Sequence, residues 1–108
     1  AVIVDDFAPH LWTGAGACAK WANDFDADNK KNQVTDVAVK LGKPRHVDVT
    51  GDRAYVVVPA SLTFKDHGKA MAEPAAVWTF VLQKSGGSWR ITAWAWGAGK
   101  ASAVKSGA

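Results

Sequence analysis

Several residue types that build common functional sites are scarce in this chain of 108 residues. It has one cysteine, Cys18, so no disulfide can form within it; the redox compartment stays undetermined, and the cytoplasm is the default expectation. Its three histidines, His10, His46 and His67, lie far apart and lack the spacing of metal ligands. We therefore expect no metal site and no cofactor.

Long apolar runs and clustered charge are also missing. No segment approaches the roughly 18 apolar residues of a membrane-spanning helix, and no signal peptide is visible, so we expect no membrane association. The net charge is only +3, and the lysines are scattered rather than gathered with aromatic residues on one face. Nucleic-acid binding is therefore not expected. The Gly14–Gly16 segment does not follow the strand of a βαβ unit and lacks the third glycine of a phosphate-binding loop.

The hydrophobic pattern changes period along the chain. Between residues 18 and 25 apolar residues recur with helical spacing, which predicts an amphipathic helix over 14–29, capped by Thr13. Cys18 belongs to this apolar stripe and is expected to be a buried, inert thiol. From residue 34 onward the period becomes two, which predicts an antiparallel meander. Its strands are expected over 34–41, 46–50, 53–65, 70–84 and 89–96.

Three details of this meander can be predicted from single residues. Pro59 cannot donate to a ladder, so we expect a break in the 53–65 strand. The Glu73-Pro74 pair predicts a bulge in the 70–84 strand. The chain is expected to form one domain, ordered over about 1–99 and followed by a small-residue tail over 100–108.

Alternation within the last two strands gives the sheet two apolar faces. Trp78, Phe80 and Leu82 are expected to share one face of their strand. On the next strand, the alternation separates Trp89, Ile91, Ala93 and Ala95 from Arg90, Thr92, Trp94 and Trp96. A single helix covers only one face of a sheet, so we expect the other to meet a second copy in a homodimer.

The chain resembles a known superfamily in the Asp5-Asp6-Phe7 segment before the helix, the 50–59 hairpin, and the strand segments that begin at Phe80 and Trp89. It looks like a small bacterial member of the nuclear transport factor 2-like superfamily, which includes ketosteroid isomerases and SnoaL-like cyclases. The resemblance implies an α+β fold in which a cone-like, curved antiparallel sheet packs on helices around a hydrophobic pocket. It also implies a dimer.

The resemblance is incomplete at the N-terminus. Members of the superfamily open with a long helix ahead of the segment that matches Asp5-Asp6, and this chain begins without it. We expect that helix either to lie in an upstream segment or to be replaced by an element from a partner. Without it, part of the apolar lining of the cone would be exposed.

The resemblance nominates Asp6 and His10 as catalytic residues. Ketosteroid isomerases use an aspartate near this position as general base, and dehydratase-like relatives use histidine with aspartate inside the cone. The acid of the isomerase oxyanion hole would fall near Trp78, which cannot serve, and the tyrosine of that hole belongs to the missing helix. The alternative for both residues is a surface role, Asp6 as a capping or solvated carboxylate and His10 as a loop residue beside Pro9.

Three functions stay open at this stage. The first is a binding module for a small apolar or aromatic molecule, because aromatic residues are plentiful and titratable groups that converge are few. The second is an isomerase, cyclase or dehydratase that uses Asp6 and His10, and the third is a structural dimerisation domain. The expected ligand-binding residues are all aromatic, and their alternative is plain core packing: Trp12, Trp21, Phe25, Tyr55, Trp78, Phe80, Trp94 and Trp96.

Overall fold

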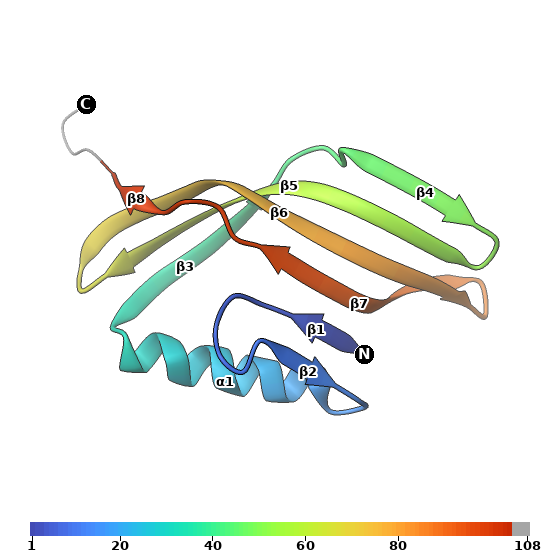
Figure 1. Cartoon of the computed structure of the whole chain (residues 1–108), viewed down its shortest axis with the longest axis horizontal. Helices are drawn as coiled ribbons and strands as arrows, with labels where there is room; N and C mark the ends of the chain where they lie inside the picture. The colour runs from blue at the N-terminus through green and yellow to red at the C-terminus, as the bar shows by residue number, and fades with distance from the viewer. Residues whose placement is uncertain (105–108) are drawn as a thin grey trace.

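The computed structural model describes residues 1–104, and within that range one helix lies beneath a curved, open sheet of eight strands (Figure 1). The predicted α+β class is therefore confirmed, and so is the curved sheet packed on α-structure. The elements in chain order are β1 (Val2–Val4), β2 (Leu11–Thr13), α1 (Ala17–Lys31), β3 (Val34–Leu41), β4 (His46–Thr50), β5 (Arg53–Asp66), β6 (Lys69–Ser85), β7 (Ser88–Gly97) and β8 (Ser102–Ala103).

The long strands form the predicted antiparallel meander. The sheet order is β2-β1-β7-β6-β5-β3, with β4 also paired to β5 and β8 to β6. The parallel pair of β1 with β7 is the exception to antiparallel pairing in the part of the chain that is described. The short strands β1 and β2 were not predicted, because three residues are too few to establish an alternating pattern. They bring the N-terminal segment between β7 and the helix.

The helix begins later than its sequence pattern suggested. It starts at Ala17 after Gly16, with no side-chain cap, while Thr13 ends β2. The buried side carries Ala17, with Trp21 and Phe25 partly buried at intervals of four residues. Cys18 is exposed, so the prediction of a buried thiol is wrong. The error arose because the stripe was drawn through Cys18 rather than through the adjacent Ala17.

The predicted bulge lies between β5 and β6. Ala60 pairs with Ala76 and Leu62 with Glu73, so two residues of β6, including Pro74, face one residue of β5. This confirms the bulge at Glu73-Pro74. The expected break at Pro59 does not occur: β5 continues through it, and Pro59 still pairs with Val77 in register.

A second bulge, in β7, changes which side chains share a face. Val81 pairs with Ala93, but the next residue, Leu82, pairs with Ile91, so Thr92 is the extra residue. An inserted residue reverses the alternation beyond it. Ile91 therefore lies on the Leu82 side of the sheet, together with Trp94, and not opposite it. The sequence-based assignment of Trp89 and Ile91 to the other face is wrong for this reason.

The end of the chain is more ordered than the predicted tail. β8 pairs with β6, Met71 opposite Ala103 and Ala72 opposite Ser102. The strand therefore falls inside the segment predicted to be unstructured over 100–108, whose last four residues lie outside the described range. No helix in that range is long and apolar enough to cross a membrane.

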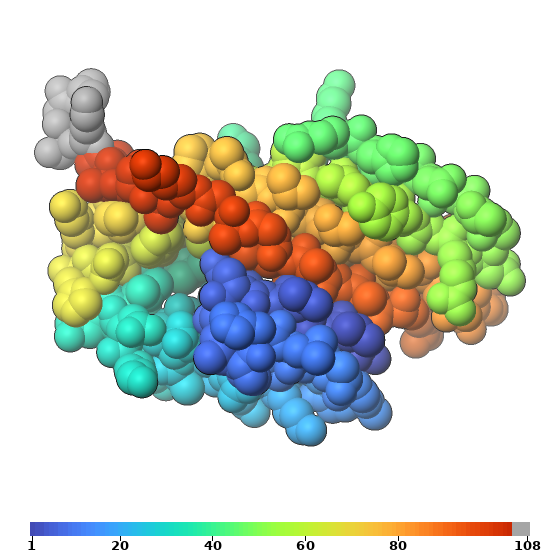
Figure 2. Space-filling model, in the orientation of Figure 1, coloured from blue at the N-terminus to red at the C-terminus, as the bar shows by residue number. Residues whose placement is uncertain are grey.

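The best-buried cluster lies where the N-terminal segment meets the helix. Ile3, Trp12 and Ala17 are almost completely buried, and Phe7, Trp21 and Trp94 pack against them. Figure 2 shows the N-terminal residues, in blue, filling the space between β7 and the helix. Toward β4 the sheet extends past the helix (Figure 1), and hydrophobic residues there, such as Val47, Val49 and Ile91, are more than half exposed.

Candidate functional site

A cavity lies between α1 and the inner face of the sheet. Its volume is about 100 Å³, and since a water needs roughly 10–15 Å³ of such space, it has room for several waters or one small organic molecule. Its lining comes from the segment after β1, from α1, and from β3, β5, β6 and β7. The lining residues are Asp5, Asp6, Trp21, Phe25, Val37, Val39, Leu62, Trp78, Trp94 and Trp96.

Strand pairing and the helix bring the aromatic side chains of this cavity together. Trp78 on β6 pairs with Trp96 on β7, and the register places Trp94 on the same face, two residues away. The Trp78 ring makes T-shaped contacts with Trp94 and Trp96 at 5.3 and 5.4 Å between centroids. From the helix, Trp21 stacks on Phe25 at 5.0 Å and meets Trp94 edge-on at 5.1 Å. The result is an aromatic wall contributed by three elements.

Asp5 is the buried titratable group of the cavity. The residue is 9% exposed, and both carboxylate oxygens accept hydrogen bonds. Oδ1 accepts the Asp6 backbone N–H at 2.7 Å, and Oδ2 accepts the Trp21 indole N–H at 2.9 Å. Burial raises the pKa of Asp5 above its ordinary value, and these two hydrogen bonds partly oppose the shift. Asp5 is therefore a fixed carboxylate whose charged form the fold disfavours.

The two residues nominated for catalysis do not meet across the cavity. Asp6 lines it and is exposed to solvent. His10 is absent from the lining; its Nδ1 donates to the Asp5 backbone carbonyl at 3.1 Å, since a carbonyl oxygen can only accept. The imidazole thus supports the loop that carries Asp5. The geometry supports a carboxylate pair, Asp5 and Asp6, in place of the predicted Asp6–His10 pair.

The expected ligand-binding residues divide into two groups. Trp21, Phe25, Trp78, Trp94 and Trp96 line the cavity, whereas Trp12, Tyr55 and Phe80 are not among its lining residues.

Each of the three residues outside the cavity has another position. Trp12 is buried in the cluster with Ile3 and donates its indole N–H to Asp24 at 2.8 Å. Tyr55 is 44% exposed and packs edge-on against His46. Phe80 packs against Trp78 at 5.0 Å. The sequence placed Tyr55 and Phe80 on predicted strands and Trp12 in no predicted element, and it could not show which of these rings border a void.

Trp78 carries an unsatisfied polar group. Its indole N–H is buried and, among residues 1–104, has no hydrogen-bond acceptor. A buried donor without a partner forfeits its hydration, at a cost of about 1–3 kcal/mol. The surrounding rings of Trp94 and Trp96 hold the indole in place by packing alone. Aromatic packing, and not a polar network, therefore defines this part of the wall.

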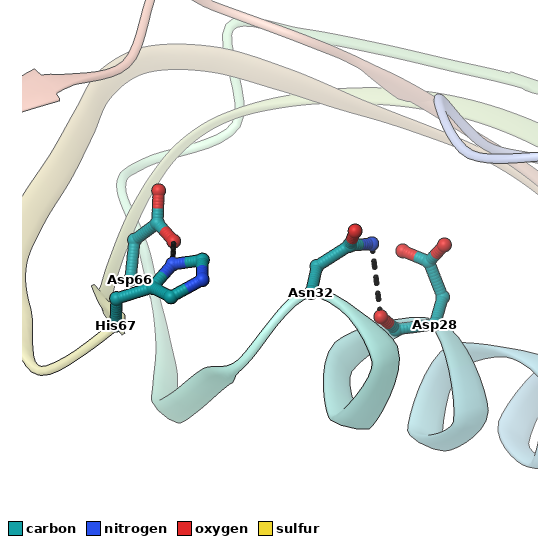
Figure 3. A network of polar contacts seen from close by, with 4 residues as sticks. All are labelled: Asp28, Asn32, Asp66 and His67. Atoms are coloured by element: carbon teal, nitrogen blue, oxygen red, sulfur yellow. Dashed lines mark hydrogen bonds and ion pairs between the residues drawn. The ribbon is translucent and has the colours of Figure 1, made fainter.

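The other two histidines, His46 and His67, are not among the residues that line the cavity. His67 occupies the turn between β5 and β6, where its Nδ1 lies 2.6 Å from Asp66 Oδ1 (Figure 3). The same figure shows the end of α1, where Asn32 donates to the Asp28 backbone carbonyl. His67 also donates its backbone N–H to Gln33, which joins this turn to the end of the helix. These contacts are structural.

Comparisons with known proteins support the fold. Neither a protein-family model nor a curated protein matches the sequence. Among solved structures, a hexachlorocyclohexane dehydrochlorinase (LinA) type 2 matches with a TM-score of 0.74 and 12% identity, over 97% of this chain and 68% of that chain. A de novo designed protein with a curved β-sheet matches with a TM-score of 0.45 and 18% identity, over 90% of this chain and 74% of that one.

The dehydrochlorinase likeness establishes the architecture of the chain. At 12% identity it shows shared fold and nothing about activity. The match shows that the chain has the fold of that dehydrochlorinase, with a curved sheet packed on α-structure, as predicted from the sequence.

Proposed function

We propose that this chain binds a small, largely apolar molecule in the cavity between α1 and the sheet. The observation that carries the proposal is the composition of the lining, eight of whose ten residues are aromatic or aliphatic. Pockets that bind small molecules combine such walls with a few fixed polar groups, and Asp5 and Asp6 supply those here. The fold, which a dehydrochlorinase shares, is compatible with an internal ligand site.

A cavity-filling substitution tests this proposal. Val39 lines the cavity and is 44% exposed, while Val4 is 42% exposed and is not among the lining residues. Val39→Phe should weaken binding of an uncharged probe such as benzyl alcohol by about tenfold or more, while Val4→Phe should leave it unchanged. Tryptophan fluorescence reports binding, because Trp21, Trp78, Trp94 and Trp96 border the cavity. Equal affinity in both variants, or no binding by the wild-type chain, would contradict the proposal.

A second candidate is catalysis by proton abstraction. The observation in its favour is the Asp5 carboxyl, buried in the cavity wall with a raised pKa, as suits a general base. In an elimination such as dehydrochlorination, the carboxylate would take a proton from carbon as the double bond forms and chloride leaves. Chloride release from hexachlorocyclohexane by the wild-type chain, lost in Asp5→Asn, would support this candidate. Absence of release would leave binding without turnover.

We also propose that the outer face of the sheet is covered by a second copy of the chain. Strand pairing puts Tyr55, Val57, Thr79 and Val81 on the face opposite Trp78 and Trp94, and α1 covers only the other side (Figure 1). A sheet face of this kind can pair with itself about a two-fold axis. Sedimentation should show a dimer that Tyr55→Glu dissociates; a wild-type monomer at micromolar concentration would refute this.

A further inference from the structure

The cavity combines aromatic rings with negative charge. Five of its ten lining residues are aromatic, two are aspartates, and none of those ten is lysine, arginine or histidine. Indole and phenyl faces carry a negative electrostatic potential that attracts cations, most strongly for tryptophan. Apolar walls screen charge less than water does, so the buried Asp5 carboxylate acts strongly on whatever enters, and the exposed Asp6 carboxylate adds a weaker attraction. Both features of the lining therefore favour a positively charged occupant.

Asp5 has no counter-ion within the described residues. The ion pairs found there join Lys30 to Asp26, Lys65 to Asp36 and His67 to Asp66. The oxygens of Asp5 are held in place by Trp21 and Asp6, yet each retains further acceptor capacity. A buried carboxylate without a basic partner is costly unless a ligand supplies the missing charge.

We propose that the ligand is a small organic cation, an alkylated ammonium whose methyl groups contact the tryptophan rings and whose charge faces Asp5 and Asp6. This inference rests on the proposed binding function and narrows the ligand to one chemical class. The aromatic wall supplies apolar and cation–π contacts, and the two aspartates supply the counter-charge. An inorganic cation would gain little from rings and aliphatic side chains, and a neutral ligand would leave Asp5 unpaired.

A matched pair of probes separates charge from shape. Choline carries a quaternary nitrogen, and 3,3-dimethylbutan-1-ol is its neutral isostere with carbon in place of that nitrogen. Calorimetric titration of the full chain should show choline binding about tenfold or more tightly than the isostere, the expected gain from one desolvated cation–π contact. Both probes compete with benzyl alcohol if they share the cavity.

Variants assign the charge preference to the cavity. Asp5→Asn should reduce the choline preference, and Asp6→Asn, at an exposed position that tolerates substitution, provides a second test if Asp5→Asn does not fold. Asp24→Asn is the control: Asp24 also accepts a tryptophan N–H, at 2.8 Å, but is absent from the cavity lining. The preference should persist in Asp24→Asn.

The outcomes distinguish this inference from the function on which it rests. Equal or tighter binding of the isostere would overturn the cation proposal and leave small-molecule binding intact. Benzyl alcohol binding that neither probe displaces would do the same. The cation proposal would also be overturned if the preference for choline stayed the same in Asp5→Asn and in Asp6→Asn. Failure of all three probes to bind would refute the binding function itself.

Discussion

The chain contains two tryptophan–aspartate hydrogen bonds that differ in the exposure of the acceptor. Trp21 donates to Asp5 at 2.9 Å, and Asp5 is buried; Trp12 donates to Asp24 at 2.8 Å, and Asp24 is exposed. A hydrogen bond to a charged group is worth about 1.5–3 kcal/mol when water cannot replace the lost partner. Where water can replace it, about 0.5–1 kcal/mol is expected.

Double-mutant cycles measure this difference directly. Trp21→Phe combined with Asp5→Ala should give a coupling energy of about 1.5–3 kcal/mol in urea unfolding. Trp12→Phe combined with Asp24→Ala should give less than about 1 kcal/mol. The packing lost with each indole cancels within its own cycle, so the deep burial of Trp12 does not bias the comparison. Equal couplings, or the larger one for Trp12 and Asp24, would refute the account of Asp5 as a desolvated acceptor.

Two further predictions concern pH and backbone packing. Burial raises the pKa of Asp5, so the folded chain holds this proton more tightly than the unfolded chain, and this contribution to the free energy of unfolding falls as pH rises through that pKa. Urea unfolding at several pH values should therefore show that Asp5→Asn gains stability relative to wild type as pH rises. Asp6 and His10 are present in both proteins and do not contribute to this difference. A difference in unfolding free energy that stays constant with pH would contradict the raised pKa of Asp5. Gly99→Ala would place a Cβ 2.6 Å from the Ala75 carbonyl oxygen and should destabilise the fold by about 1–3 kcal/mol in thermal unfolding. Gly16→Ala, whose Cβ would meet only Lys20 Cε at 3.8 Å, should cost less than about 1 kcal/mol, since its cost comes only from an alanine at the helix N-cap. Equal effects of the two glycine substitutions would contradict the close packing of Gly99 against β6.

The periodicity of apolar residues in the sequence predicted most of the long elements of the fold. The alternation in 34–96 predicted the five long strands, because each has a repeating contrast between its two faces. It failed where one residue breaks the repeat, as at Thr92, since nothing in the local composition of β7 marks the extra residue. It also failed for β1 and β2, which are stabilised by tertiary contacts with β7 and α1 rather than by any pattern of their own.

The site was only partly predictable, because tertiary contacts rather than local sequence pattern decide which side chains border the cavity. Trp21, Phe25, Trp78, Trp94 and Trp96 could be expected inside from their residue type. Asp5 was passed over in favour of its neighbour, because which of two adjacent carboxylates turns inward depends on the register of β1 against β7. Val37, Val39 and Leu62 were missed because aliphatic strand residues carry no signal that separates a cavity wall from a solid core.

The central claim is that the space bordered by Trp21, Trp78, Trp94 and Trp96 receives a ligand. Nuclear Overhauser contacts between the methyl protons of bound choline and assigned indole protons test it most directly. The account predicts contacts to these cavity indoles and none to Trp89, which is 41% exposed and absent from the lining. Contacts to Trp89 alone, or to no indole at a choline concentration that saturates binding, would contradict it.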